Sequence, residues 1–288
     1  MPVPAREVIL PGFYYFCRMI AVQTYVPEKL HPFVKSFWRL EVTAATGQPY
    51  EEDIIPDGHH EIIFHLQPCS GSRKTEHQHW APEPDAFFAG QTLRSYSLQL
   101  SPGAVLYGIR FYPHTLALLF NFPATSITDQ LLPLADIPAA ALLRSCITAN
   151  APGTFSRLEN MLYTRIAALQ PPDSFRYVHA SVAAILQQKG HVKVDTLVRQ
   201  AGISGRHLDN SFKKFAGITP KILCNIVKLN HFIHHKKQHA FKSLTACTYE
   251  AAFYDQSHLI KLFRTFTGKS PGAFFNDANY ISAHFTAM

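Results

Sequence analysis

Three kinds of feature are missing from this sequence of 288 residues. It has no run of about 18 uncharged apolar residues, the length a transmembrane helix needs, so we expect no membrane partner. No C-x-x-C pair is present. The five cysteines are odd in number and scattered, which favours reduced thiols in the cytoplasm over a disulfide framework. The N-terminal segment carries no basic n-region, and Arg18 interrupts its apolar stretch, so we expect no signal peptide.

Common catalytic motifs are missing as well. The sequence contains no G-x-S-x-G, no P-loop and no H-E-x-x-H. Its 16 histidines raise the question of a metal, and two groups stand out: His59, His60, Glu61 and His65 with His77 and His79, and then His231, His234, His235 and His239. Consecutive histidines on a strand point to opposite faces, and the second group reads as a basic helix face. We therefore predict no metal site, no cofactor and no catalytic residue.

Acidic residues are scarce in one part of the chain only. Residues 1–170 hold 12 Lys and Arg against 14 Asp and Glu, a net charge of −2. Residues 171–288 hold 15 against 6, a net charge of +9. The charge asymmetry suggests that the second part meets a polyanionic partner. Charge alone leaves open the alternative of a basic surface that is simply solvated.

A domain boundary is readable near residue 170. Pro171 and Pro172 end the apolar-periodic stretch before them, and Asp173 or Ser174 can cap a new helix. Before the boundary, short strand-like runs separated by Pro and Gly turns indicate a small barrel or sandwich, with helices over 135–169. After it, the pattern is helical throughout. The predicted fold class is α+β with two domains, 1–170 and 171–288.

An internal repeat with an offset of 51 residues is the most informative pattern. Six residues recur unchanged: His207, Leu208, Phe212, Phe215, Gly217 and Pro220 become His258, Leu259, Phe263, Phe266, Gly268 and Pro271. Such repetition means two copies of one supersecondary unit. In the first unit Asp195 or Thr196 caps one helix, and Ser204 caps a second. In the second unit the turn falls at 253–254, and Asp255 is the cap. Each unit is predicted to be helix, short turn, helix.

The second helix of each unit has a polar face opposite its apolar one. Arg, Asn, Gln and Lys at such a face suit base edges and phosphates in a DNA major groove. The base-reading candidates are Arg206, Asp209, Asn210, Gln256, Ser257 and Lys261, and the phosphate candidates are Ser204, Lys213, Lys214, Arg264 and Lys269. Asp209 would accept from a cytosine amine. For one unit alone an ordinary amphipathic helix pair is the better reading, but two units inside the basic part favour DNA.

The two units resemble the DNA-binding domain of AraC-type transcription regulators. The resemblance is clearest in two segments, SGRHLDNSFKKFAGITP at 204–220 and FYDQSHLIKLFRTFTGKSP at 253–271, and it covers residues 174–275. It implies two helix-turn-helix lobes joined by a long helix, here Pro220–His235. IPDGHHEIIF at 55–64, FAGQ at 88–91 and GIRFYP at 108–113 resemble the sensory domain of some such regulators. That likeness implies a cupin-like β-barrel with trailing helices.

These patterns together predict a cytoplasmic transcription regulator. An activator is expected, but the sequence leaves open whether the protein activates or represses. Its expected partners are double-stranded DNA, a small-molecule effector and RNA polymerase. A homodimer is expected through an apolar stripe on the helix over 155–169, although that stripe could instead pack on the barrel. Two alternatives stay open: a cupin-type metalloenzyme fused to DNA-binding repeats, and a ligand-independent architectural DNA binder.

Overall fold

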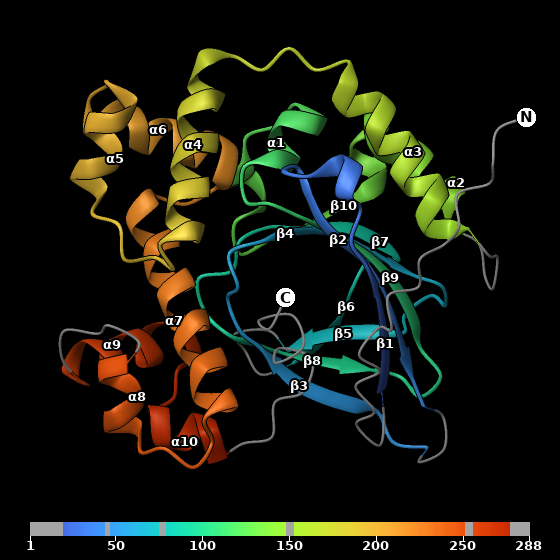
Figure 1. The fold of residues 1–288 in the computed structure, drawn as a ribbon. Helices are drawn as coiled ribbons and strands as arrows, with labels where there is room; N and C mark the ends of the chain where they lie inside the picture. The colour runs from blue at the N-terminus through green and yellow to red at the C-terminus, as the bar shows by residue number, and fades with distance from the viewer. Residues whose placement is uncertain (1–19, 44–46, 75–78, 148–152, 251–255, 277–288) are drawn as a thin grey trace, which may run out of the picture.

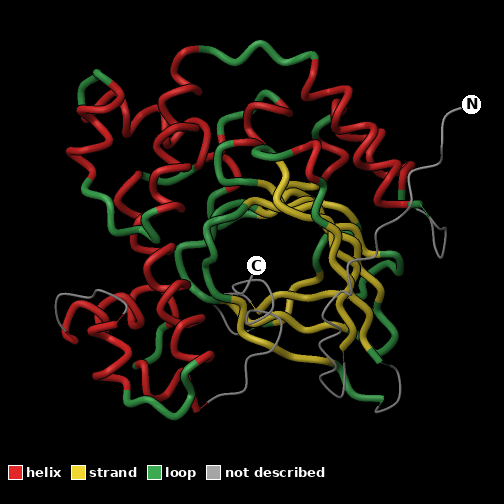
Figure 2. The backbone as a smooth tube through the Cα atoms, in the orientation of Figure 1, coloured by secondary structure: helices red, strands yellow, loops and turns green. Residues whose placement is uncertain are grey.

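The computed structural model describes residues 20–43, 47–74, 79–147, 153–250 and 256–276. Strands dominate the first part of the chain and helices the second, so the predicted α+β layout is confirmed (Figures 1 and 2). The helices after residue 173 lie along one side of the strand domain, and α2 and α3 lie over another part of it. Within the described ranges, no helix combines the length and apolar character that a membrane crossing requires.

The strands form two antiparallel sheets that face each other around a shared interior, which gives the domain its barrel shape (Figure 2). The six-stranded sheet has the order β1 (Ile20–Tyr25), β2 (Val34–Val42), β9 (Val105–Phe111), β4 (His60–His65), β7 (Ala86–Ala89) and β10 (Leu131–Pro133). The four-stranded sheet has the order β3 (Tyr50–Ile54), β8 (Tyr96–Leu100), β5 (Gly71–Lys74) and β6 (Trp80–Pro82).

In strand β9, alternate side chains point to opposite faces of the sheet, and one of these faces lines the barrel interior. All seven of its residues are buried, because both faces of the strand are covered. Tyr107 and Ile109 belong to the core under the overlying helices, whereas Leu106 belongs to the core inside the barrel. Gly108 also faces inward: a Cβ there would lie 1.9 Å from the Trp38 ring. The missing side chain therefore lets Trp38 cross the strand and line the interior.

Helices α1 (Thr115–Phe120), α2 (Ala141–Cys146) and α3 (Thr154–Ala167) cover the outer face of the larger sheet. The apolar stripe of α3 is used there. Leu158 and Leu162 are fully buried, and Phe155 stacks on Tyr25 and Phe37 with ring centroids 6.0 Å apart in each case. Most of the stripe thus packs on the barrel, and only Tyr163 of this face is largely exposed.

The helical part comprises α4 (Asp173–Gln187), α5 (Val194–Ala201), α6 (Gly205–Ala216), α7 (Pro220–Gln238), α8 (Leu244–Glu250), α9 (Gln256–Thr267) and α10 (Pro271–Asn276). The joining helix α7 runs three residues past the expected end at His235. Helix α4 begins at Asp173, but its core also takes in Ile55, Ala117 and Ala124 from the strand domain. Because one apolar core crosses residue 170, the division into 1–170 and 171–288 stays a prediction.

Candidate DNA-binding surface and barrel cavity

The first helix-turn-helix unit is formed by α5 and α6. Gly202 makes the turn in the left-handed region, and the Ser204 side chain accepts a hydrogen bond from the backbone N–H of His207 at 3.2 Å, as expected of a cap. The predicted cap at Asp195 or Thr196 is wrong. Lys193 occupies that position without a side-chain hydrogen bond, and Asp195 lies in the first turn. An acidic residue there still favours the positive end of the helix dipole.

The polar side chains predicted on α6 do lie on its solvent side. Arg206, Asn210, Lys213 and Lys214 are exposed, and Asp209 is half-buried beside them. The opposite face buries Leu208, Phe212 and Phe215. Nothing in the described structure covers the exposed side, so a duplex has access to it. Whether these residues read bases or contact phosphates stays a prediction.

The second unit is formed by α8 and α9. The predicted turn at 253–254 and the cap Asp255 lie outside the described residues. On α9 the candidates Gln256, Ser257, Lys261 and Arg264 are exposed, while Leu259, Phe263 and Phe266 are buried. The Gln256 amide donates to the Thr245 hydroxyl of α8 at 2.6 Å, which ties the start of α9 to its partner helix.

One exposed residue of α9 is not among the candidates that the sequence predicts. Ile260 keeps 37% of its surface exposed in the middle of the polar face. The sequence spacing indicates this position, because Ile260 lies four residues after Gln256 and four before Arg264. Residues four apart share a helix face.

The first unit is attached to the strand domain through apolar and buried contacts. Helix α6 packs on α1 and on the 3₁₀ turn Ala124–Ile127, and the Thr128 hydroxyl donates to the Gly217 carbonyl at 3.0 Å. Next to it, the rings of His114 and His179 share a hydrogen bond of 2.9 Å across the two domains. Burial and the neighbouring His179 lower the pKa of His114 to about 3.

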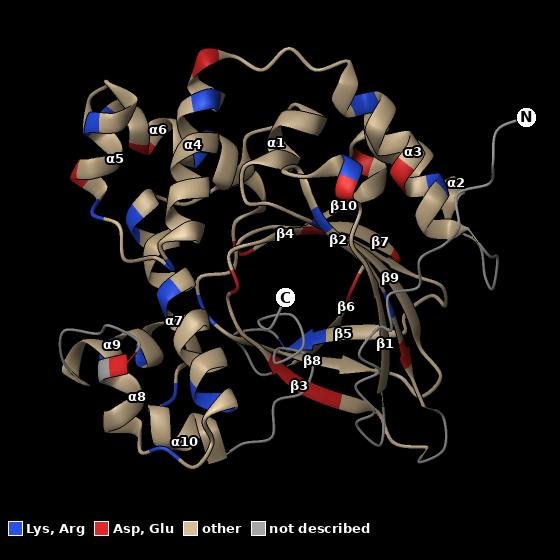
Figure 3. Cartoon of the chain, in the orientation of Figure 1, with Lys and Arg blue, Asp and Glu red and all other residues tan. Residues whose placement is uncertain are grey.

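The second unit is attached through polar contacts instead. Ser95 donates from its backbone N–H to the Phe266 carbonyl at 2.8 Å and from its hydroxyl to the Thr267 carbonyl at 3.1 Å. Lys269, a phosphate candidate, pairs with Asp53 of β3 at 2.8 Å. Strand β3 is marked by its acidic residues in Figure 3. In this arrangement a carboxylate holds the lysine that was expected to meet DNA.

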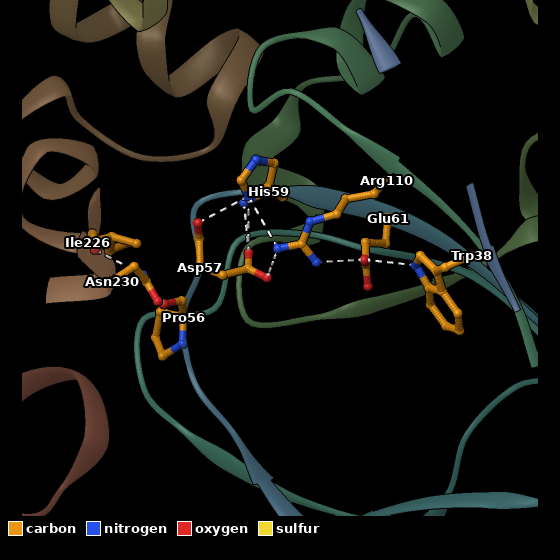
Figure 4. Close-up of polar contacts among 8 residues, drawn as sticks. All are labelled: Trp38, Pro56, Asp57, His59, Glu61, Arg110, Ile226 and Asn230. Atoms are coloured by element: carbon orange, nitrogen blue, oxygen red, sulfur yellow. Dashed lines mark hydrogen bonds and ion pairs between the residues drawn. The ribbon is translucent and has the colours of Figure 1, made fainter. Parts of the chain in front are cut away.

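Between these attachments, the segment of residues 53–58 contacts the joining helix through Pro56 and Gly58. We call these residues the coupling segment. The Asn230 side chain of α7 donates to the Pro56 carbonyl at 2.8 Å (Figure 4). Gly58 adopts a φ of 82°, and a Cβ there would lie 3.2 Å from Leu223 and 3.6 Å from Ile226. The segment thus meets α7 along more than one turn.

The same segment lines a cavity inside the barrel. Counting its open mouth, the cavity holds about 610 Å³ of empty space. Its walls are mostly apolar or aromatic: Trp38, Leu40, Ile54, Ile55, Ile63, Tyr96, Leu98, Leu100 and Leu106. Its charged lining consists of Asp57, Glu61, Arg73, Glu83 and Arg110. Apolar walls with a few convergent polar groups are typical of small-molecule sites.

The buried Arg110 links the cavity floor to the coupling segment. Its guanidinium pairs with Asp57 and, at 2.9 Å, with Glu61, which also accepts from the Trp38 indole (Figure 4). Arg110 holds the pKa of Asp57 well below its usual range, whereas burial raises the pKa of Glu61. Asp57 and Glu61 lie in the motif at 55–64 and Arg110 lies in the motif at 108–113, but neither motif indicates that the three side chains form one cluster.

The histidine groups do not assemble into a metal centre in the described part of the chain, where no three His, Cys, Asp or Glu side chains converge as ligands. His77 lies outside the described residues. Burial, Lys35 and Arg110 lower the pKa of His59 to about 3, and burial lowers the pKa of His60 to about 4. His235 contacts Glu250 at 2.9 Å. His59 thus contacts Asp57 and Arg110 within the strand domain, and His235 links α7 to α8.

Comparison with known families agrees with this architecture. Residues 197–277 match a family described as "Helix-turn-helix domain", and residues 23–133 match one described as "Domain of unknown function (DUF6597)". The chain carries an AraC-type helix-turn-helix domain. The predicted AraC-type helix-turn-helix domain is therefore confirmed.

Among solved structures, the chain is similar to ToxT from Vibrio cholerae at 9% identity, with 90% of this chain and 98% of that one covered and a TM-score of 0.41. A fatty-acid-bound ToxT from strain SCE256 aligns at 11% identity over 79% and 94%, with a TM-score of 0.40. The AraC-like transcriptional activator CuxR aligns at 16% identity over 71% and 83%, with a TM-score of 0.27. No curated protein matches.

Proposed function

We propose that this regulator reads DNA bases with α6 and α9, and that a small molecule in the barrel cavity controls its binding. The carrying observation is that the coupling segment belongs to both sites. It lines the cavity through Ile54, Ile55 and Asp57, and it contacts the helical domain through Pro56 and Gly58. A ligand that shifts this segment changes the position of α7, and α7 joins the two units.

The cavity also suggests the chemistry of the effector. Its apolar walls suit an apolar body, and the Arg110, Asp57 and Glu61 group suits one polar group on that body. A polar group that takes a hydrogen bond from Arg110 competes with Asp57, a member of the coupling segment. The ligand would therefore make different contacts in the state with the Arg110–Asp57 ion pair and in the state without it. A ligand can shift a conformational equilibrium only if its affinity for the two conformations differs.

Base reading is tested with duplexes that the full-length protein selects from a random DNA pool. Arg206→Ala and Lys261→Ala should each weaken the binding free energy for the preferred duplex by about 1–3 kcal/mol. Each variant should also lose the preference for a particular base at one position of the duplex. Lys213→Ala should weaken every sequence alike, because a phosphate contact carries no sequence information. If all three variants lose affinity uniformly, the base-reading assignment is wrong and an architectural DNA binder is the better description.

Control through the cavity can be tested without knowing the effector. Leu98 lines the cavity, so Leu98→Phe fills part of it, while Leu142→Phe adds the same bulk to a leucine that is 68% exposed on α2. Leu98→Phe should change the affinity for the selected duplex several-fold, and Leu142→Phe should not. Adding Asn230→Ala should remove most of the Leu98→Phe effect. An effect of equal size with and without Asn230 contradicts coupling through this contact.

The remaining partners stay predictions. A homodimer through α3 would have to use what the barrel leaves exposed, chiefly Tyr163 at 53% exposure and Leu142 on the adjacent α2. Light scattering of the full-length protein, alone and on its duplex, tests it. Contact with RNA polymerase and location in the cytoplasm are proposed from the regulator function alone.

We also propose that the barrel has no enzymatic activity. Metal analysis of untagged protein tests the metalloenzyme alternative, which a stoichiometric metal lost in His60→Ala would favour.

A further inference from the structure

Ile260 is an apolar side chain at the centre of a polar surface. It keeps 37% of its area exposed on α9, and it belongs to none of the apolar clusters that hold the helical domain together. Gln256 precedes it by one helical turn and Arg264 follows by one turn, and both are exposed. Exposing an isoleucine to water among charged residues brings no benefit to the free protein.

The internal repeat gives this position a counterpart in the first unit. At the offset of 51 residues, Ile260 corresponds to Asp209 of α6, just as Lys261 corresponds to Asn210 and Arg264 to Lys213. Both members of the pair lie on the fifth residue of their helix, since α6 begins at Gly205 and α9 at Gln256. The two units therefore present opposite chemistry at the same place: an acceptor that is half-buried, and an apolar group that is exposed.

We propose that Ile260 contacts the methyl group of a thymine, and that Asp209 and Ile260 make the two units read different bases at equivalent positions. The inference rests on the proposed base-reading role of α9. In the major groove the C5 methyl of thymine is the apolar feature that identifies a base pair, and the cytosine N4 amine is the donor that a carboxylate accepts. The two parts of the operator should accordingly differ in sequence, with a thymine facing the second unit.

The surroundings of Ile260 favour DNA over a protein as its partner. Lys261 and Arg264 flank it with positive charge on the same exposed face. A phosphate contact from Arg264 would hold the helix against the duplex, while Ile260 and Lys261 face the base edges. Packing against another protein is the competing outcome, and the experiment separates the two.

Removal of single methyl groups is the direct test. Each thymine of the duplex selected by the full-length protein is replaced, one at a time, by deoxyuridine, which lacks only the C5 methyl. At one position the replacement should weaken wild-type binding about four-fold, the effect expected for one buried methyl-sized group. Ile260→Ala should bind the thymine and deoxyuridine duplexes equally well. Thr265→Ala, at another exposed residue of α9, should keep the four-fold difference.

Exchange of the paired residues sharpens the result. Ile260→Asp places the residue of the first unit into the second, and it should shift the preferred base from thymine towards cytosine at that position in a repeated selection. If no thymine shows methyl dependence, or if the dependence persists in Ile260→Ala, the proposal is wrong. Base reading by α6 and α9 would still be supported if Arg206→Ala and Lys261→Ala lose base preference at one position each. Failure of the Ile260 proposal can therefore be distinguished from failure of the proposed base-reading function.

Discussion

The two helix-turn-helix units are copies of one pattern, but they are held to the barrel by different physics. The first unit buries α6 against α1 and a 3₁₀ turn, and beside this contact His114 is hydrogen-bonded to His179 of α4. The second unit is held by two hydrogen bonds from Ser95 and by the ion pair of Lys269 with Asp53. An apolar attachment changes little with ionic strength, whereas a partly exposed ion pair weakens as salt rises. The second unit is thus the one that DNA phosphates can most easily recruit.

The largest expected effect tests the apolar attachment. Ala117 of α1 is 4% exposed and belongs to the same core as Phe212 and Phe215 of α6. Ala117→Asp would bury a charge without a partner, and we expect a loss of several kcal/mol in the free energy of unfolding. Chemical denaturation measures the loss, and hydrogen exchange should show faster opening of α6 than of α9. Ala117→Ser is the control of similar size. An unchanged unfolding free energy for Ala117→Asp would mean that α1 does not hold the first unit.

Acid should separate the two attachments next. The pKa of His114 in the folded protein, about 3, lies below the ordinary 6.5, so the folded state excludes a proton that the unfolded state accepts. Stability is therefore intact above pH 6.5 and is lost as the pH falls below it. At pH 5 this single histidine should lower the free energy of unfolding by about 2 kcal/mol relative to its value above pH 6.5.

The variant His114→Gln should remove that part of the pH dependence. Asp53 provides the contrast, because Lys269 and Ser97 lower its pKa and its contribution is lost only when the pH falls below the ordinary carboxyl range. Denaturation curves between pH 6.5 and 5 should therefore show the same slope for Asp53→Asn as for the wild type. Equal slopes for His114→Gln and the wild type would contradict the role given to the ring pair.

The sequence revealed the units better than it revealed their attachments. Ser204, Gly217 and Pro220 act within one or two helical turns, so their pattern predicts the local structure directly. The misplaced cap at Asp195 is an error of two residues at a helix end, where several residue types compete for the cap position. The sequence predicts that Lys269 faces DNA, because the sequence shows nothing of its contact with Asp53, 216 residues away.

The barrel cavity likewise depends on contacts between distant segments, which local sequence patterns do not reveal. Alternation along a strand tells which residues of β9 share a face, but not that both faces are buried. That outcome depends on helices α1–α3 covering one side and the second sheet facing the other. In the same way, the Asn230 contact with Pro56 spans 174 residues, and nothing in either local motif announces it. Contacts between distant segments follow from packing, which a single sequence does not display.

The smallest effect concerns the ion pair itself, and it decides whether the second attachment competes with DNA. Asp53→Asn should cost at most about 1 kcal/mol of stability, because both partners are 33% exposed. It frees Lys269 to meet a phosphate, so the affinity for duplex should rise at low salt. The slope of log affinity against log salt should steepen by about 1.

A double variant separates this effect from the general gain of positive charge. Asp53→Asn combined with Lys269→Gln removes the carboxylate and also the lysine that it held. If the affinity gain of Asp53→Asn disappears in the double variant, Lys269 itself contacts the phosphate. A gain that persists unchanged would come from the altered net charge, and Asp53 would then serve only to fasten the second unit to β3. In that case the attachment and DNA binding would be independent, and the route from cavity to DNA would run through α7 alone.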